Sequence, residues 1–316
     1  MKSINNIFKT IGLSVLLVAA FSCDDLLDTD PSVGQITREE VLADANLVRL
    51  AVNGLYTENL LVNWAYRSDL TLYIGVAADD VFNTSTSYDD LKNNTYTPTN
   101  AYTGYIWQYF YQSVFYSNDI LELVDDAAKA GTITQSEAAV YSAEAKYFRA
   151  YSYFALTALW GDVPLVTSTD ILKTSLQARE SKETVSQFVI DDLKEVAATL
   201  ADASDATKVT GTAAKALLAR QYLYAKDYAN AEKYADDVIK NSGAVLEPDL
   251  GKVFVRSSRE TLFKTSTDNT YSSYIDRTYI GYYSLYGSYL RFTDDLVNSF
   301  EAGDLRFAKW VKDQGT

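Results

Sequence analysis

The sequence predicts a mainly α-helical fold in which helices stack as pairs in an α-α superhelix, with long irregular loops and little β structure. Three observations predict it. Helix-capping sequences precede apolar residues at helical spacing in several places. One segment, residues 213–243, reads as two short helices joined by a tight turn. Two polar segments, residues 79–104 and 266–289, have no sustained helical period.

The N-terminus predicts export and lipidation. Lys2 and Lys9 form a positively charged start before an apolar run at residues 11–21, which has signal-peptide length and is too short to span a bilayer. The only cysteine, Cys23, follows small residues and resembles the acylated cysteine of a bacterial lipobox. The alternative is a buried free thiol at the end of a retained helix. We expect a signal peptide over 1–22, a lipidated acidic tether over 23–36, and a single helical domain over 37–316.

Four helices are expected before the helix pair. Three begin at capping boxes: "TREE" at 37–40, "TQSE" at 134–137 and "TVSQ" at 184–187. The second should end at Gly161 and Pro164. The fourth covers 105–124, where one face carries Trp107, Tyr111, Val114, Asn118 and Leu121.

Residues 213–243 match the tetratricopeptide pattern. Small and aromatic residues recur at the expected positions: Leu218, Ala219 and Tyr222, then Tyr228 at the turn, then Ala231, Ala235 and Val238. A lone repeat cannot bury its own apolar face, so the other helices should stack on it. Downstream, the runs at 252–256 and 260–265 predict a small hairpin at most.

Composition excludes several classes of function. The chain has 316 residues and a net charge of −14, which repels nucleic acid. It has no histidine, so catalytic triads and the usual zinc sites are disfavoured. A single cysteine forms no intramolecular disulfide, and no EF-hand spacing appears. We expect neither a metal nor another cofactor.

The run "RAYSYFALTALWGDVPL" at 149–165 resembles the SusD/RagB family of nutrient-binding outer-membrane lipoproteins. Further stretches agree in order: Cys23 with Leu27, Asp28 and Pro31, then 188–200, 213–243 and 294–306. Family chains usually continue well past the motif at Asp304 and Arg306, so part of the C-terminal region would be lacking. The resemblance implies a lipid-anchored, surface-exposed outer-membrane protein. Such a protein captures glycans or other oligomers and delivers them to a SusC-like TonB-dependent transporter.

The motif residues themselves read as structural. Trp160, Gly161, Asp162 and Pro164 would form a helix stop with an aromatic plug, and Arg149 a buried or half-buried ion-pair partner.

Ligand contacts are expected in the loops, because sugar rings lie against aromatic faces while their hydroxyls bond acids and amides. The candidates are Asp80, Phe82, Asn83 and Tyr88 in the first polar segment and Tyr274, Tyr282, Tyr283 and Tyr286 in the second. Any single tyrosine is more simply a core or solvent-lining ring, whereas the two loops taken together favour a binding role.

Two other functions stay open. Paired acids recur, and those in a candidate loop, Asp79 and Asp80, could serve a lipoprotein glycoside hydrolase. A tetratricopeptide scaffold could also be an adaptor that binds a protein partner. We expect capture of an oligosaccharide or polysaccharide without catalysis.

Overall fold

The computed structural model describes residues 36–62, 65, 69–83, 86–203, 207–255, 257–264 and 290–311. The predicted signal peptide, the lipidation site at Cys23 and nearly all of the tether lie outside the described residues. The helices are α2 (Arg38–Ala43), α3 (Ala45–Tyr56), a π-helix η1 (Thr57–Val62), α4 (Leu70–Ala77), η3 (Thr86–Tyr88), α5 (Asp89–Lys92), α6 (Ala101–Lys129), α7 (Gln135–Trp160), α8 (Ile171–Thr174), α9 (Lys182–Thr199), α10 (Gly211–Tyr224), α11 (Tyr228–Asn241), η4 (Leu250–Lys252), α14 (Asp294–Asn298) and α15 (Leu305–Trp310). The strands are β1 (Val81–Asn83), β2 (Val163–Pro164), β3 (Arg179–Glu180) and β4 (Leu290–Phe292). The prediction of a mainly helical fold with little β structure is confirmed.

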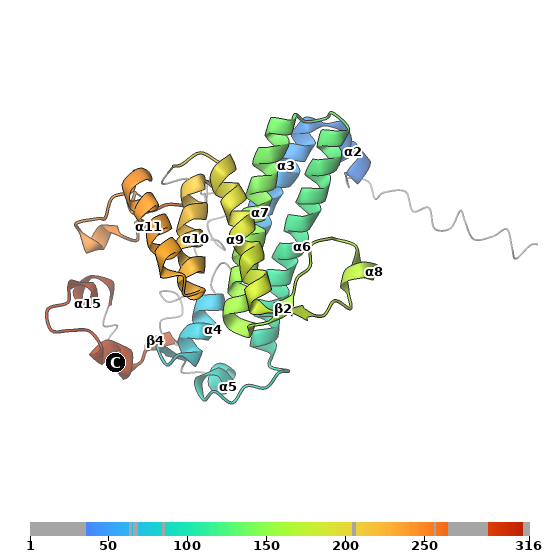
Figure 1. The fold of residues 1–316 in the computed structure, drawn as a ribbon. Helices are drawn as coiled ribbons and strands as arrows, with labels where there is room; N and C mark the ends of the chain where they lie inside the picture. Colours follow the sequence, from blue (N-terminus) through green and yellow to red (C-terminus); the bar gives the residue numbers. More distant parts are fainter. Residues whose placement is uncertain are drawn as a thin grey trace, which may run out of the picture.

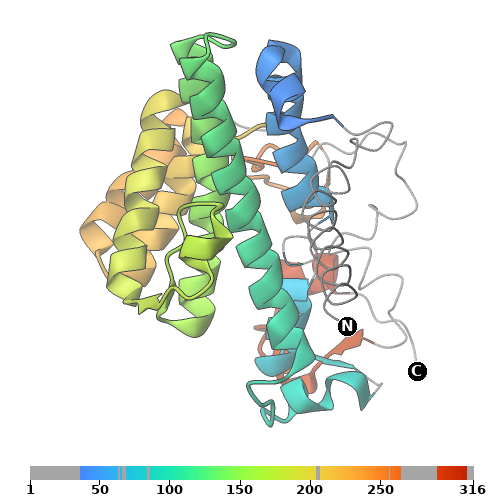
Figure 2. The same cartoon turned by 90° about the vertical axis from the view of Figure 1, so that its right-hand side faces the viewer.

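The long helices form a sequential array. Each of α6, α7, α9, α10 and α11 packs against the next helix in that order (Figure 1). Helix α3 packs against α6 and α7, and Figure 2 shows it on the opposite side of those helices from α10 and α11. Helix α7 therefore lies at the centre of the array.

The core follows α7 and its neighbours. Tyr153, Phe110, Phe148, Leu193 and Leu218 are among its largest fully buried side chains. Burying each side chain of this size contributes about 1.5–3 kcal/mol. Small residues on α7, including Ala143, Ala145 and Ala150, are also buried, so neighbouring helices can approach its backbone. The apolar residues that recur at helical spacing in the sequence therefore face the interior of the array.

The predicted tetratricopeptide pair is formed by α10 and α11. Tyr228 is the first residue of α11, and the Asp227 side chain caps that helix. The rings of Tyr222 and Tyr234 stack across the pair at a centroid distance of 5.6 Å and an interplanar angle of 10°. Lys226, in the turn, has a φ of 62° in the left-handed region.

Two of the three predicted capping boxes form. Thr37 with Glu40 and Thr134 with Glu137 each make both hydrogen bonds of the motif. The third prediction is wrong by one helical turn, because Ser181 caps α9 and its hydroxyl accepts from Thr184 N at 3.1 Å. The helix period continues back through Lys182, so Ser181 is the first residue outside it.

The β structure joins segments far apart in the sequence. Strands β1 and β4 pair antiparallel, with Val81 opposite Phe292, and β2 pairs with β3. The runs at 252–256 and 260–265, predicted to form a small hairpin at most, form no two-stranded hairpin over their described residues. That stretch holds the end of η4, turns and a single bridge residue, Phe263. Residues 265–289, which contain the second polar segment, lie outside the described residues.

Candidate functional site

A cavity of about 520 Å³ opens beside the first turns of α6. Its lining comes from the end of the first polar segment, from α6, from the last residue of α7 and from β3: Tyr96, Thr97, Pro98, Thr103, Gly104, Trp107, Trp160 and Arg179. Aromatic faces and hydrogen-bonding groups therefore meet at one place.

Two tryptophans form a corner of this cavity. The rings of Trp107 and Trp160 meet edge to face, with centroids 5.2 Å apart and an interplanar angle of 84°. Both side chains are half-buried and pack on the core. Because the rings are nearly perpendicular, a flat ligand that lies on one face has its edge against the other.

Arg179 extends over the same corner. Its guanidinium carbon lies 5.3 Å from the Trp107 ring centroid, and its Nη1 donates to the Asp162 carbonyl oxygen at 2.5 Å. The residue is exposed, and its other side-chain N–H groups make no hydrogen bond with a described residue. They are available to hydroxyl or carboxyl oxygens of a ligand.

A side-chain N-cap fixes the α6 side of the cavity. The Asn100 side-chain oxygen accepts from Tyr102 N at 3.0 Å and from Thr103 N at 3.2 Å, so the helix begins at the cavity wall. Nearly two turns beyond that start, Trp107 contacts Trp160 at the end of α7. Tyr111, a further turn along, donates from its hydroxyl to the Pro164 carbonyl at 2.7 Å, and burial raises its pKa.

The segment after α7 fixes the other side. Gly161 has a φ of 71°, which favours glycine and lets the chain reverse directly after Trp160. Asp162 Oδ1 then accepts from Lys182 N at 2.9 Å, tying the turn to the start of α9. The predicted helix stop is therefore present, and Trp160 also lines the cavity.

Four predicted ligand residues lie on described elements near α4. Asp80 is exposed, and its carbonyl accepts from Thr293 N at 3.1 Å. Phe82 is half-buried on β1 opposite Arg291, and Asn83 pairs with Leu290 on the same sheet. None of these residues lines the cavity.

The fourth predicted ligand residue, Tyr88, belongs to a tyrosine cluster. Its ring centroid lies 5.9 Å from that of Tyr73 and 4.9 Å from that of Tyr102. Tyr73 and Tyr102 are 4.9 Å apart, which closes the cluster. Burial raises the pKa of Tyr73 and of Tyr102, so both hydroxyls stay protonated near neutral pH. Tyr102 precedes Thr103 of the cavity lining, so cluster and cavity share the first turn of α6.

Sequence reasoning missed Tyr96, Trp107 and Arg179 as ligand candidates and read Trp160 as structural only. Position along the chain was an available signal for Trp107, because it follows the first polar segment by one helical turn. No local signal marked Arg179. The predicted Tyr274, Tyr282, Tyr283 and Tyr286 lie outside the described residues.

The described residues bring neither a carboxylate nor a metal-ligand cluster to this cavity. No carboxylate occurs among the described lining residues, and Asp79 and Asp80 lie at the end of α4. Over the described ranges, no three His, Cys, Asp or Glu side chains gather where they could hold a metal ion. None of the described helices combines the length and apolarity needed to cross a bilayer.

Known proteins resemble this chain in sequence. A protein-family profile, SusD-like_3, described as "Starch-binding associating with outer membrane", matches residues 25–223. A SusD-like protein of Bacteroides ovatus is 29% identical over 179 residues, which are 53% of this chain and 31% of that protein. SusD-like protein P38 of Formosa agariphila is 24% identical over 247 residues, 77% of this chain and 47% of that protein. The chain thus spans between about a third and a half of the curated relatives it matches.

Solved structures resemble it in fold. A SusD superfamily protein of Bacteroides thetaiotaomicron superposes with a TM-score of 0.68 at 20% identity, covering 81% of this chain and 61% of the other. A laminarin-binding SusD-like protein superposes at 0.59 and 21% identity, covering 66% and 48%. A structure with xylogluco-oligosaccharide superposes at 0.57 and 26% identity, covering 66% and 43%.

Proposed function

We propose that this chain, which belongs to the SusD/RagB family, binds oligosaccharides at the cavity formed by Tyr96, Trp107, Trp160 and Arg179. The observation that carries the proposal is the perpendicular tryptophan pair beside an exposed guanidinium. Sugar rings present flat C–H faces and a rim of hydroxyls, which match an aromatic wall and N–H donors.

The energies favour reversible capture. An aromatic face that hides about 60 Å² of sugar surface contributes about 1.5 kcal/mol. Two or three such faces give about 3–5 kcal/mol, which corresponds to roughly millimolar dissociation constants before hydrogen bonds are added. Binding of this strength permits release to a second protein.

We further propose that the bound glycan is released intact. The described cavity lining carries Tyr96, Thr97, Thr103 and Arg179 among its polar side chains and lacks the pair of carboxylates that most glycoside hydrolases use. Relatives whose names state laminarin binding or xylogluco-oligosaccharide indicate the class of ligand to test.

We also propose the cellular setting that the family implies. Acylated Cys23 would hold the protein at the outer membrane, exposed at the surface, where it passes glycans to a SusC-like TonB-dependent transporter. The family description of outer-membrane association supports this setting. Replacement of Cys23 by alanine should release the processed protein from the membrane fraction. Retention of the C23A protein in that fraction would contradict the anchor.

Tyr96→Ala and Tyr105→Ala test the glycan site as a matched pair. Tyr96 is 46% exposed and lines the cavity, whereas Tyr105 is 48% exposed and does not. We expect calorimetry with laminarin-, xyloglucan- and starch-derived oligosaccharides to show binding that weakens about tenfold in Y96A, since one stacked face is lost. Binding by Y105A should equal that of the wild type. Failure of the wild type to bind any of these glycans, or equal losses in the two variants, would overturn the proposal.

A further inference from the structure

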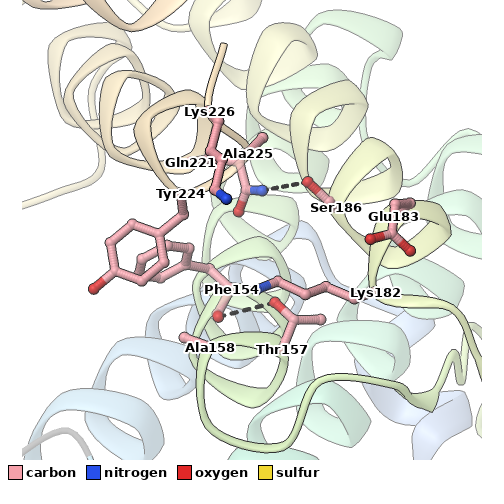
Figure 3. A pocket seen from close by; sticks show the side chains of 10 residues that line it. All are labelled: Phe154, Thr157, Ala158, Lys182, Glu183, Ser186, Gln221, Tyr224, Ala225 and Lys226. Atoms are coloured by element: carbon pink, nitrogen blue, oxygen red, sulfur yellow. Dashed lines mark hydrogen bonds between the residues drawn. The ribbon is translucent and has the colours of Figure 1, made fainter. Parts of the chain in front are cut away.

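A second cavity lies inside the helix array (Figure 3). It has a volume of about 360 Å³ and lies between the C-terminal part of α7, the first turns of α9 and the end of α10. No residue lines both this cavity and the one beside Trp107. The two cavities are therefore lined by separate residues, although Ala158 of this cavity and Trp160 of the other both lie in the last turn of α7.

The centre of this cavity carries an unsatisfied buried acceptor. Gln221 on α10 is 3% exposed, and its Nε2 donates to Ser186 Oγ on α9. Its Oε1 is buried and has no hydrogen-bond partner among the described residues. Figure 3 shows this oxygen turned toward Phe154 and Lys182. A buried acceptor without a donor is unfavourable, so a ligand N–H or O–H would stabilise it.

Two lysines give the cavity a positive charge. Lys182 at the start of α9 and Lys226 in the turn after α10 both line it, and neither forms an ion pair with a described residue. Figure 3 shows their side chains extending into the lined space. Glu183 is the acid of the described lining. In a chain with 42 acids and 28 Lys and Arg, this local excess of positive charge favours an anionic ligand.

An aromatic surface borders these polar groups. Phe154 and Tyr224 pack edge to face, with centroids 5.0 Å apart and an interplanar angle of 70°. Phe154 is 8% exposed, whereas Tyr224 is 53% exposed and offers the open ring. A flat C–H face of a ligand could lie on it.

We propose that this cavity is a second carbohydrate site, which binds a hexuronic acid residue of an acidic oligosaccharide. One such ring carries a carboxylate for the lysines, hydroxyl donors for Gln221 Oε1 and a C–H face for Tyr224. An acidic peptide would have to supply the same three features from separate residues. The choice of a sugar rests on the proposed carbohydrate-binding function, whereas the anionic character rests on the cavity alone.

Calorimetry with trigalacturonate and the full chain tests this site. We expect the wild type to bind it, with affinity that falls as salt is raised. The Lys182→Met/Lys226→Met double variant should bind at least tenfold more weakly, and Gln221→Leu several-fold more weakly. Lys240→Met, an exposed lysine at the far end of α11, is the control and should bind as the wild type does. All three should keep wild-type affinity for a neutral oligosaccharide.

The outcomes separate this site from the first cavity. Loss of trigalacturonate binding in Tyr96→Ala but not in the double lysine variant would place the acidic sugar in the first cavity and overturn this proposal alone. Absence of trigalacturonate binding would also overturn it, as would hexaglutamate binding here in its place. Loss in the double variant would support it even if neutral oligosaccharides failed to bind, a result that would count against the first cavity only.

Discussion

Arg149 on α7 and Asp192 on α9 form a two-pronged ion pair inside the helix array. Arg149 Nε donates to Asp192 Oδ2 and Nη2 donates to Oδ1, both at 2.9 Å, and each side chain is 8% exposed. The remaining Nη1 donates to Asn118 Oδ1 on α6 at 2.9 Å. Burial raises the pKa of the Asp192 carboxyl, and the hydrogen bonds and charge of Arg149 oppose that shift. One guanidinium therefore joins three consecutive helices, and the predicted ion-pair role of Arg149 is confirmed.

Removing one partner of this pair should destabilise the protein strongly. Arg149→Met leaves a buried carboxylate without its charge partner, which costs about 3–5 kcal/mol. The double variant Arg149→Met/Asp192→Leu should lose less than the sum of the two single losses, because no uncompensated charge remains. Chemical denaturation monitored by circular dichroism measures each free energy of unfolding.

The neighbouring pair of Lys146 and Glu195 provides the control for that series. Its Nζ–Oε1 distance is 2.5 Å, but Glu195 is 55% exposed. Lys146→Met should therefore cost about 1 kcal/mol or less. Strict additivity of the Arg149 and Asp192 losses would contradict the coupling that we infer.

Gly211, the first residue of α10, leaves no room for a side chain. A Cβ placed there would lie 2.5 Å from the Leu200 carbonyl oxygen and 2.8 Å from Asp202 Oδ1. Since backbone must move to admit the methyl group, Gly211→Ala should reduce the free energy of unfolding by about 1–3 kcal/mol.

Gly54 on α3 is the matched control for this substitution. A Cβ there meets nothing within 4 Å. Gly54→Ala should stabilise the protein by up to about 1 kcal/mol, because alanine is the better helix former. The same denaturation assay applies, and equal effects at the two glycines would show that close packing at Gly211 is not what selects glycine.

Local signals predicted much of this fold. The boxes at Thr37 and Thr134 involve atoms three residues apart, so the sequence alone displays them. The pairing of Val81 with Phe292 is different, since it depends on how the intervening helices bring those segments together. The apolar run at 252–256 has strand-like composition, but no partner strand lies beside its described residues. Composition favours a strand, and tertiary contacts decide whether one forms.

The candidate site was predicted only as a region. Tyr96 belongs to the polar segment that was expected to bind a ligand, because a long loop without helical period suggests function. Trp107, Trp160 and Arg179 come from three separate elements, and their corner exists only because α6 packs on α7 and β2 pairs with β3. Each tryptophan at helical spacing is more simply read as core, and both are in fact partly packed there. When one side chain both packs in the core and lines a cavity, its helical spacing in the sequence indicates only the core position.

Glu122 on α6 should make stability depend on pH in the acid range. Its carboxylate accepts from Thr169 N at 3.0 Å, from Thr169 Oγ1 at 2.5 Å and from Ser168 Oγ at 3.2 Å. Burial raises its pKa, but these hydrogen bonds together outweigh burial and hold the pKa below its ordinary value of 4.5. A lowered folded pKa means that the stabilisation is present above pH 4.5 and is lost as pH falls through the folded value.

Glu122→Gln should therefore lower the melting temperature at neutral pH and flatten its decline as the pH falls below 4.5. Thermal melts at several pH values measure this difference. Glu39→Gln, an exposed acid in the first turn of α2, should leave the shape of the curve as in the wild type. A curve for E122Q parallel to that of the wild type would show that the carboxylate contributes no proton linkage.

Variants of Arg179 can separate two contributions to glycan binding, that of the planar guanidinium geometry and that of the positive charge. It holds the Asp162 carbonyl through Nη1 while lying over the Trp107 ring, an arrangement that one planar group with several N–H donors can maintain.

Because hydrogen bonds to charged groups contribute about 1.5–3 kcal/mol, Arg179→Met should weaken oligosaccharide binding by roughly tenfold or more. The loss in unfolding free energy should stay below about 1 kcal/mol, since the side chain is exposed. Arg179→Lys should recover little of the affinity, because one ammonium group cannot hold the carbonyl, cover the indole ring and keep further donors for the sugar. Glu180→Gln, at the next position of β3, is the control and should bind like the wild type in the same calorimetric titration. Full affinity in the lysine variant would mean that positive charge alone suffices, and the guanidinium geometry would then have no part in recognition.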